Sequence, residues 1–376
     1  MAEPKKRGLF GLPTPVVITV AVLFLGIFIL AILVGPIGQG LFNALFGHAP
    51  HFPSWMTVPK PEPKLPVPVL FHIGGFGVTN SMIASWITVV FLIVFSWMVT
   101  RRMKLIPGRV QGMFESLLGW IYDFVVGISG DENARKFFPV VCTIFLFVGF
   151  NAWLSLIPGF VSIQYQRIDD LPANTHVITA TTGENAGQLE LVNADGTPFD
   201  MASVFSGETS IISKNGEYYV MDKEDLIRAA NTDINVPIAI AIFSVLWTLF
   251  MGVKFLGPGW FKQYFNFGPM FHAIGGVFKG KLNAMAFFDA GIAIFVGGLE
   301  FLSFWIRIIS FAFRLFGNMT AGEILLLIIS FLVPWVVAPI FYGLELVIGF
   351  VQALVFAGLT AVFVTLAVMP HEEESH

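Results

Sequence analysis

Long runs of hydrophobic residues, separated by shorter polar segments, set the pattern of this 376-residue chain. Four runs are close to the roughly 20 residues that a helix needs to cross a bilayer, and two later runs are longer. They cover residues 16–34, 81–100, 137–157, 236–253, 282–331 and 334–369. The pattern predicts an all-α polytopic membrane protein with five to six membrane helices, the last two long and, like other long hydrophobic helices, tilted.

Two segments between the runs have patterns of their own. Residues 110–128 carry apolar residues at helical spacing with Gln111, Glu115 and Asp123 between them, which predicts an amphipathic helix on the membrane surface. Residues 36–80 are rich in Pro, Gly and His, which favours an extended, polyproline-like chain outside the membrane.

Basic residues indicate how the runs cross the membrane. Lys5–Arg7 precede the first run, Arg101–Lys104 follow the second, and Arg135 and Lys136 precede the third. Because Lys and Arg concentrate on the cytoplasmic side, these ends are predicted to be cytoplasmic. We interpret the first run as an uncleaved anchor helix, because no small-x-small cleavage site follows it.

Residues 161–235 interrupt the hydrophobic pattern with a polar segment that holds twelve acidic residues and four basic ones. Residues 188–192, 211–214 and 217–221 read as strands with hairpin turns, and 222–230 as a short helix. We therefore expect a small β-rich insertion on the outer side of the membrane. Its negative field could collect protons, or it could stabilise the protein or bind a partner.

These patterns divide the chain into five segments. They are an N-terminal anchor helix (1–35), a Pro-rich outer linker (36–80), first core helices with the amphipathic helix (81–160), the acidic β-rich insertion (161–235) and ion-translocating core helices (236–376).

Composition agrees with a membrane protein and excludes several other classes. Hydrophobic residues make up 56% of the chain and charged residues 12%, against about 25% charged in soluble domains. Lys and Arg are few and scattered, so no nucleic-acid partner is expected. The seven histidines show no metal-ligand spacing and Cys142 is the single cysteine, so we expect neither a metal site nor a cofactor.

Polar residues within the run 282–331 are the main candidates for chemistry. An α-helix turns about 100° per residue, so residues seven apart lie within about 20° of one line. On that basis one polar stripe follows the helix: Glu300, Ser303, Arg307, Arg314 and Asn318. Because a charge inside a bilayer is costly, such residues are functional candidates by default.

Carboxylates lie on other faces. Glu323, nine residues after Arg314, points away from the stripe on a regular helix, and Glu345 and Gln352 share a face of the next run. Internal ion pairs that hold a bundle together are one interpretation. The spacing favours a second interpretation, in which two separate water-accessible paths lead to one arginine.

The stretch from Arg314 to Glu323, RLFGNMTAGE, resembles the signature of the a subunit of F-type ATP synthase, the membrane stator that faces the rotating c-ring. The resemblance extends to Glu300 with Ser303 and Arg307, to Glu345 with Gln352, and to Asn151 before the Leu-Ile-Pro that ends at residue 158.

The resemblance implies a fold and a role for each residue. The last two helices would form a tilted hairpin along the c-ring, with Arg314 as the essential arginine. The implied outer proton path contains Asn151, Asn318, Glu323, Glu345 and Gln352. The implied cytoplasmic path contains Glu300, Ser303 and Arg307.

The resemblance also implies partners and a location. The partners would be the c-ring, b-type peripheral stalk subunits, the lipid bilayer and protons. A bacterial inner membrane is preferred to the mitochondrial inner membrane, because no cleavable transit peptide is evident. The alternative function is a secondary proton-coupled transporter, which would usually show internal repeats with broken helices. A purely structural scaffold would leave the polar stripe unexplained.

Overall fold

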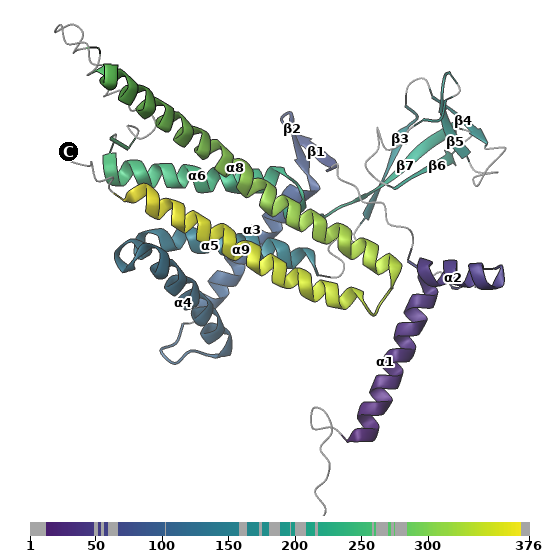
Figure 1. Cartoon of the computed structure of the whole chain (residues 1–376). Helices are drawn as coiled ribbons and strands as arrows, with labels where there is room; N and C mark the ends of the chain where they lie inside the picture. Colours follow the sequence, from purple (N-terminus) through teal and green to yellow (C-terminus); the bar gives the residue numbers. More distant parts are fainter. Residues whose placement is uncertain are drawn as a thin grey trace, which may run out of the picture. The chain divides into compact units, whose positions relative to one another are not determined.

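The computed structural model of the chain is drawn in Figure 1. It describes residues 13–48, 52–53, 56–58, 67–101, 103–157, 164–172, 175–179, 189–195, 197–199, 208–214, 217–257, 259–260, 270–271, 274 and 284–369.

The chain divides into two compact units. The first contains Met1–Leu65 and Thr320–Ile348, and the second contains Pro66–Met319 and Gly349–His376. Two long helices, α8 (Ala284–Leu332) and α9 (Ala338–Val368), contribute a segment to each unit.

Six helices among the described residues are long and apolar enough to cross a membrane. They are α1 (Thr14–Val34), α3 (Asn80–Thr100), α5 (Asp131–Ser155), α6 (Asn235–Leu256), α8 and α9. The hydrophobic runs therefore predicted these helices with ends that differ by a few residues, and the all-α polytopic fold is confirmed.

The first unit contains a helix that the composition did not predict. α2 (Pro36–Phe46) occupies part of the segment expected to be extended. Pro36 stands in its first turn, where proline's fixed φ suits a helix, and Gly47 ends it with a φ of 74°. A Cβ at Gly35, between α1 and α2, would collide with the carbonyl of Leu332, so this corner packs closely against the end of α8.

The rest of the predicted linker is only partly described. A short hairpin, β1 (Val69–Ile73) and β2 (Phe76–Thr79), turns at Gly74 and Gly75, whose φ angles of 56° and 88° favour glycine. The prolines at 59, 61, 63 and 66, on which the extended interpretation depended, lie outside the described residues.

The amphipathic helix predicted at 110–128 is confirmed as α4 (Arg109–Ser129). It packs against α5 and buries Phe114, Ile121 and Val125, which lie on one face at helical spacing. Gly130, with a φ of 73°, ends the helix and begins the turn into α5.

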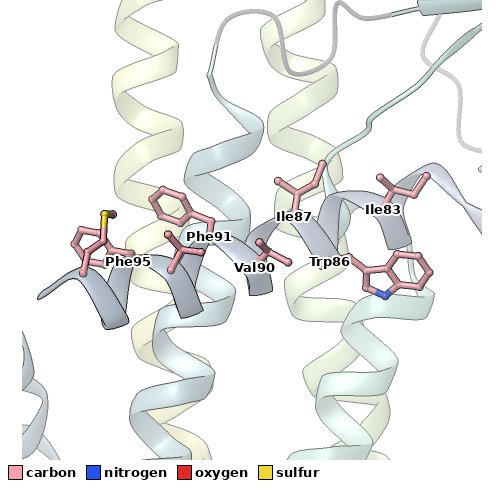
Figure 2. A pocket seen from close by; sticks show the side chains of 8 residues that line it. Ile83, Trp86, Ile87, Val90, Phe91 and Phe95 are labelled. Carbon is pink, nitrogen blue, oxygen red and sulfur yellow. The ribbon is translucent and has the colours of Figure 1, made fainter. Parts of the chain in front are cut away.

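α3 has two contrasting faces. Asn80, Ser81, Ala84 and Thr88 are buried on one face. The other carries a shallow groove of about 500 Å³, shown in Figure 2 and lined by hydrophobic side chains: Ile83, Trp86, Ile87, Val90, Phe91, Val94, Phe95 and Met98. The apolar face suits lipid contact, and the polar residues point into the protein.

α8 and α9 run antiparallel, and segments of the two helices lie against each other within each unit. In the second unit the Phe311 ring lies 5.0 Å from the Phe356 ring and 5.7 Å from the Phe363 ring, between centroids. In the first unit Gly322 of α8 faces Glu345 of α9. Trp335, with a φ of 69°, lies in the turn between the two helices.

The insertion is β-rich, as predicted. Strands β3 (Gln164–Asp170), β7 (Glu217–Asp225) and β6 (Glu208–Lys214) form an antiparallel sheet in that order, and β4 (Thr175–Thr179) pairs with β5 (Leu189–Asn193). Leu191 and Val220 are the buried centre of a small core between the two sheets.

The short helix predicted at 222–230 is wrong. Residues Asp222–Asp225 continue β7 and pair with Gln164–Arg167 of β3, and the helical part is one 3-10 turn, η3 (Ala230–Thr232). The helix prediction rested on local sequence, and pairing with strand residues 55 to 61 positions earlier overrides such a preference.

Candidate functional site

Arg314 lies at the border between a packed and an open side of α8. Phe311, Leu315 and Met319, on its packed side, are nearly fully buried within the second unit. Phe313 is 55% exposed, and a Cβ at Gly317 would meet nothing within 4 Å. A neighbouring molecule could approach the half-buried arginine from this open side.

The charge of Arg314 is not neutralised by a described carboxylate of its own unit. Its guanidinium carbon lies 5.7 Å from the centroid of the Phe311 ring, one turn earlier. Ion pairs among the described residues join Arg135 to Asp131 and Lys136 to Glu132, at the exposed start of α5. The internal pairing of Arg314 that would have made it a structural residue is therefore not seen within this part of the structure.

The polar stripe on α8 does not lie in one environment. Arg307 and Glu300 are half-buried, whereas Ser303 and Asn318 are exposed. The guanidinium carbon of Arg307 stacks 3.7 Å from the centroid of the Phe363 ring on α9, a close cation–π contact. Arg307 thus packs against α9, whereas Arg314 lies half-buried next to the open side of α8.

The first unit brings Glu323 and Glu345 together. Glu345 is only 7% exposed, and its carboxylate fills the space that a Cβ at Gly322 would need. Glu323, half-buried on α8, is near enough to interact with it electrostatically. Two carboxylates that interact can share one proton, which suits a site that accepts and releases protons.

Asn151 of α5 is buried in the second unit. Its Oδ1 lies 2.6 Å from the hydroxyl oxygen of Thr88 on α3, which donates to it. Its Nδ2 has no hydrogen-bond partner among the described residues. Asn151 is therefore a polar contact between two membrane helices, with one donor still available.

Gln352 of α9 is half-buried beside the same part of α5. A Cβ at Gly349 would lie 2.8 Å from the Cβ of Ala152, and one at Gly149 would lie 3.4 Å from the Cβ of Ala353. Two glycines thus allow α5 and α9 to approach closely, next to Asn151 and Gln352.

Sequence reasoning missed a group of buried polar residues at one end of α3: Asn80, Ser81, Asn231 and Asp233. The available signal was weak. Polar residues at the start of a hydrophobic run are usually helix caps, so their presence at the start of α3 and before α6 did not by itself indicate a site.

Comparison with known proteins decides the family. The profile of the ATP synthase A chain matches residues 82–365, about three quarters of the chain. The chain belongs to the ATP synthase A chain family. Every candidate site residue lies within the matched range, as does the buried polar group except Asn80 and Ser81.

Curated relatives of this family resemble the chain over most of their length. ATP synthase subunit a of Gloeobacter violaceus is 25% identical over 298 residues, 78% of this chain and 85% of the relative. The subunit a of Helicobacter pylori strain Shi470 is 25% identical over 287 residues, and that of Helicobacter acinonychis 24%, each covering 76% of this chain and 88% of the relative.

Membership in the ATP synthase A chain family places the chain in ATP synthesis and proton transport. Its six apolar helices make it a multi-pass membrane protein. The family also decides between the stator interpretation and the secondary transporter that the sequence pattern left open.

Proposed function

We propose that this chain is the stator a subunit of an F-type ATP synthase and that Arg314 couples proton flow to rotation of the c-ring. The observation that carries the proposal is the position of Arg314, at the border of an open side of α8 and without a described carboxylate partner in its own unit.

The proposed mechanism begins with a carboxylate on each ring subunit. Inside lipid it must carry a proton, because desolvation disfavours the charged form. Beside Arg314 it ionises, since an opposite charge within about 4–6 Å favours the charged form. Arginine suits the position because it stays protonated under all working conditions, whereas a buried lysine can lose its proton.

Two offset paths would supply and remove the proton. We assign the outer path to Asn151, Asn318, Glu323, Glu345 and Gln352, and the cytoplasmic path to Glu300, Ser303 and Arg307. The Glu323–Glu345 pair supports the outer assignment, because two interacting carboxylates, one of them buried, can pass a proton between them. The fixed positive charge of Arg314 would prevent protons from passing directly between the paths.

The energy available to each proton is modest, about 2.3 kcal/mol per 100 mV. The stator therefore needs good sealing and low friction more than tight binding. We place the chain in a bacterial inner membrane with the c-ring and b-type stalk subunits as partners, since the curated relatives named above are bacterial.

Replacing Arg314 by alanine in the complete ATP synthase tests this function. In inverted membrane vesicles we expect ATP-driven proton pumping to be lost while the a subunit still co-purifies with the ring. Arg135→Gln is the matched control, because Arg135 forms an exposed ion pair of the kind that contributes little, and pumping should persist. Normal pumping by an assembled Arg314→Ala complex would overturn the proposal.

A further inference from the structure

Two lysines from different helices meet at the end of α6. Lys254 is in the last turn of α6, and Lys136 is in the second turn of α5. The ammonium nitrogen of Lys136 lies 4.8 Å from the centroid of the Phe255 ring, and Phe255 directly follows Lys254. The same ring contacts Phe137 of α5, with centroids 6.4 Å apart. The ends of the two helices are thus joined through Phe255, with a lysine from each helix next to it.

An exposed apolar stripe on α6 leads to Lys254. Phe243, Leu246 and Phe250 precede it at spacings of three and four residues, which places all four side chains on one face of the helix. The three apolar side chains are 52–55% exposed. The ammonium nitrogen of Lys254 lies 5.9 Å from the centroid of the Phe250 ring. In a membrane helix such a stripe contacts lipid tails, and a lysine at its end reaches the level of the headgroups.

Acidic residues neutralise this end of the two helices only weakly. Nζ of Lys136 lies 3.5 Å from Oε1 of Glu132, one turn earlier on α5. The Glu132 side chain is 91% exposed, and ion pairs this exposed contribute little. Lys254 forms no ion pair with a described residue. An anion therefore binds here without displacing a strong partner.

The sequence after α6 adds positive charge to the same side. Three more lysines follow Lys254 before the next acidic residue, Asp289. Trp260 is 4% exposed and packs against Gly252, so the chain folds back on α6 directly after the helix ends. Tryptophan at the end of a membrane helix is typical of the headgroup level, and an excess of lysine is typical of the cytoplasmic side.

We propose that Lys136 and Lys254 bind the phosphate of an anionic phospholipid in the cytoplasmic leaflet, with its acyl chains along the apolar stripe of α6. Basic pockets between membrane helices on this side bind such headgroups. The stripe favours a lipid over a soluble phosphate, which has no apolar part to place there. The site uses none of the residues assigned to the two proton paths, so it does not depend on the proposed function of Arg314.

Photolabelling of the complete ATP synthase tests the site. The complex is reconstituted in phosphatidylcholine vesicles with increasing amounts of a phosphatidylglycerol that carries a photoreactive diazirine beside its phosphate. The label on the ends of α5 and α6 is then mapped by mass spectrometry. In Lys136→Gln/Lys254→Gln we expect half-saturation at an at least tenfold higher lipid fraction, because each lysine at a membrane surface strengthens the binding of anionic lipid about fivefold.

Lys104→Gln/Arg109→Gln is the matched control. It also removes two exposed positive charges from the side predicted to be cytoplasmic, but between α3 and the first turn of α4. Labelling at the end of α6 should be unchanged in this variant, and Lys136→Arg/Lys254→Arg should keep it. An equal decrease in both glutamine variants would overturn the site, because it would show that only the total surface charge matters.

Two further conditions identify the ligand. A phosphatidylcholine with the same diazirine should label this end at least tenfold less well, and an excess of inorganic phosphate should not displace the phosphatidylglycerol. Equal labelling by the two lipids would contradict the selectivity for an anionic headgroup. Displacement by inorganic phosphate would show that the lysines bind a soluble anion, and it would overturn the lipid site.

Discussion

The carboxylate of Glu345 on α9 fills the space left by the missing side chain of Gly322 on α8. Only the end of this flexible side chain, and no backbone atom, lies in that space. Gly322→Ala should therefore displace the carboxylate of Glu345 at little cost in stability, because the end of the side chain can move away. We expect ATP-driven pumping by assembled complexes to fall at least tenfold, measured in vesicles.

Gly298→Ala is the control for this change. Gly298 is also on α8, but a Cβ there would meet nothing within 4 Å, so pumping and assembly should be unaffected. Equal behaviour of the two variants would show that the fit between Gly322 and Glu345 has no role in proton transfer.

The contact between Arg307 and Phe363 should stabilise the packing of α8 on α9. Phe363→Leu removes the ring and should cost about 1 kcal/mol of cation–π energy in addition to lost packing, whereas Phe363→Tyr should keep it. A double-mutant cycle with Arg307→Gln, read from thermal unfolding of the purified protein, isolates this coupling. A coupling near zero would indicate that the two side chains are neighbours without an energetic link.

The insertion should depend on its small core. Val220 is fully buried, and Val220→Ala removes two methyl groups at about 0.8 kcal/mol each and leaves a cavity. We expect faster proteolysis within the insertion of the full-length protein. Ile168→Ala, at a strand position that is 51% exposed, should leave the cleavage rate nearly unchanged, and an equal increase in both variants would contradict this core.

Removing the acidic insertion distinguishes the two roles that the sequence left open. With residues 165–230 replaced by a short flexible linker, we expect coupled ATP synthesis to persist with reduced stability, since the strands are attached to the core through Asn80 and Asp225. A proton-collecting role predicts instead that synthesis falls without loss of assembly. That loss should be largest at low ionic strength, where the field of the insertion extends furthest.

Elements that depend on neighbouring residues could be predicted from the sequence, whereas those that depend on contacts between distant residues could not. The membrane helices follow from runs such as Phe287–Leu332, because a helix satisfies all of its backbone hydrogen bonds within one continuous apolar segment. α2 was missed because the Pro, Gly and His content of residues 36–80 was taken to favour extended chain throughout, although proline at the start and glycine at the end of a segment are also helix boundaries.

The sequence could not predict which polar residues of the site pair with one another, because these pairs form between residues far apart in the chain. The stripe from Glu300 to Asn318 follows from helical periodicity alone, and α8 is continuous over that range. The pairing of Thr88 with Asn151, 63 residues later, and of Ser81 with Asp233, 152 residues later, depends on how the helices pack. No local pattern specifies such partners.

Cross-linking to the ring measures the central claim most directly, because it asks which side of α8 meets the moving carboxylate. In the Cys142→Ala background, Phe313→Cys and Leu315→Cys are each combined with a cysteine placed beside the carboxylate of the ring subunit. Phe313 is exposed next to Arg314, and Leu315, the other neighbour of Arg314 in sequence, is 1% exposed within the second unit. We predict a strong oxidative cross-link to the ring from Phe313→Cys and none from Leu315→Cys. A cross-link from Leu315→Cys alone, or from neither in assembled complexes, would contradict the account.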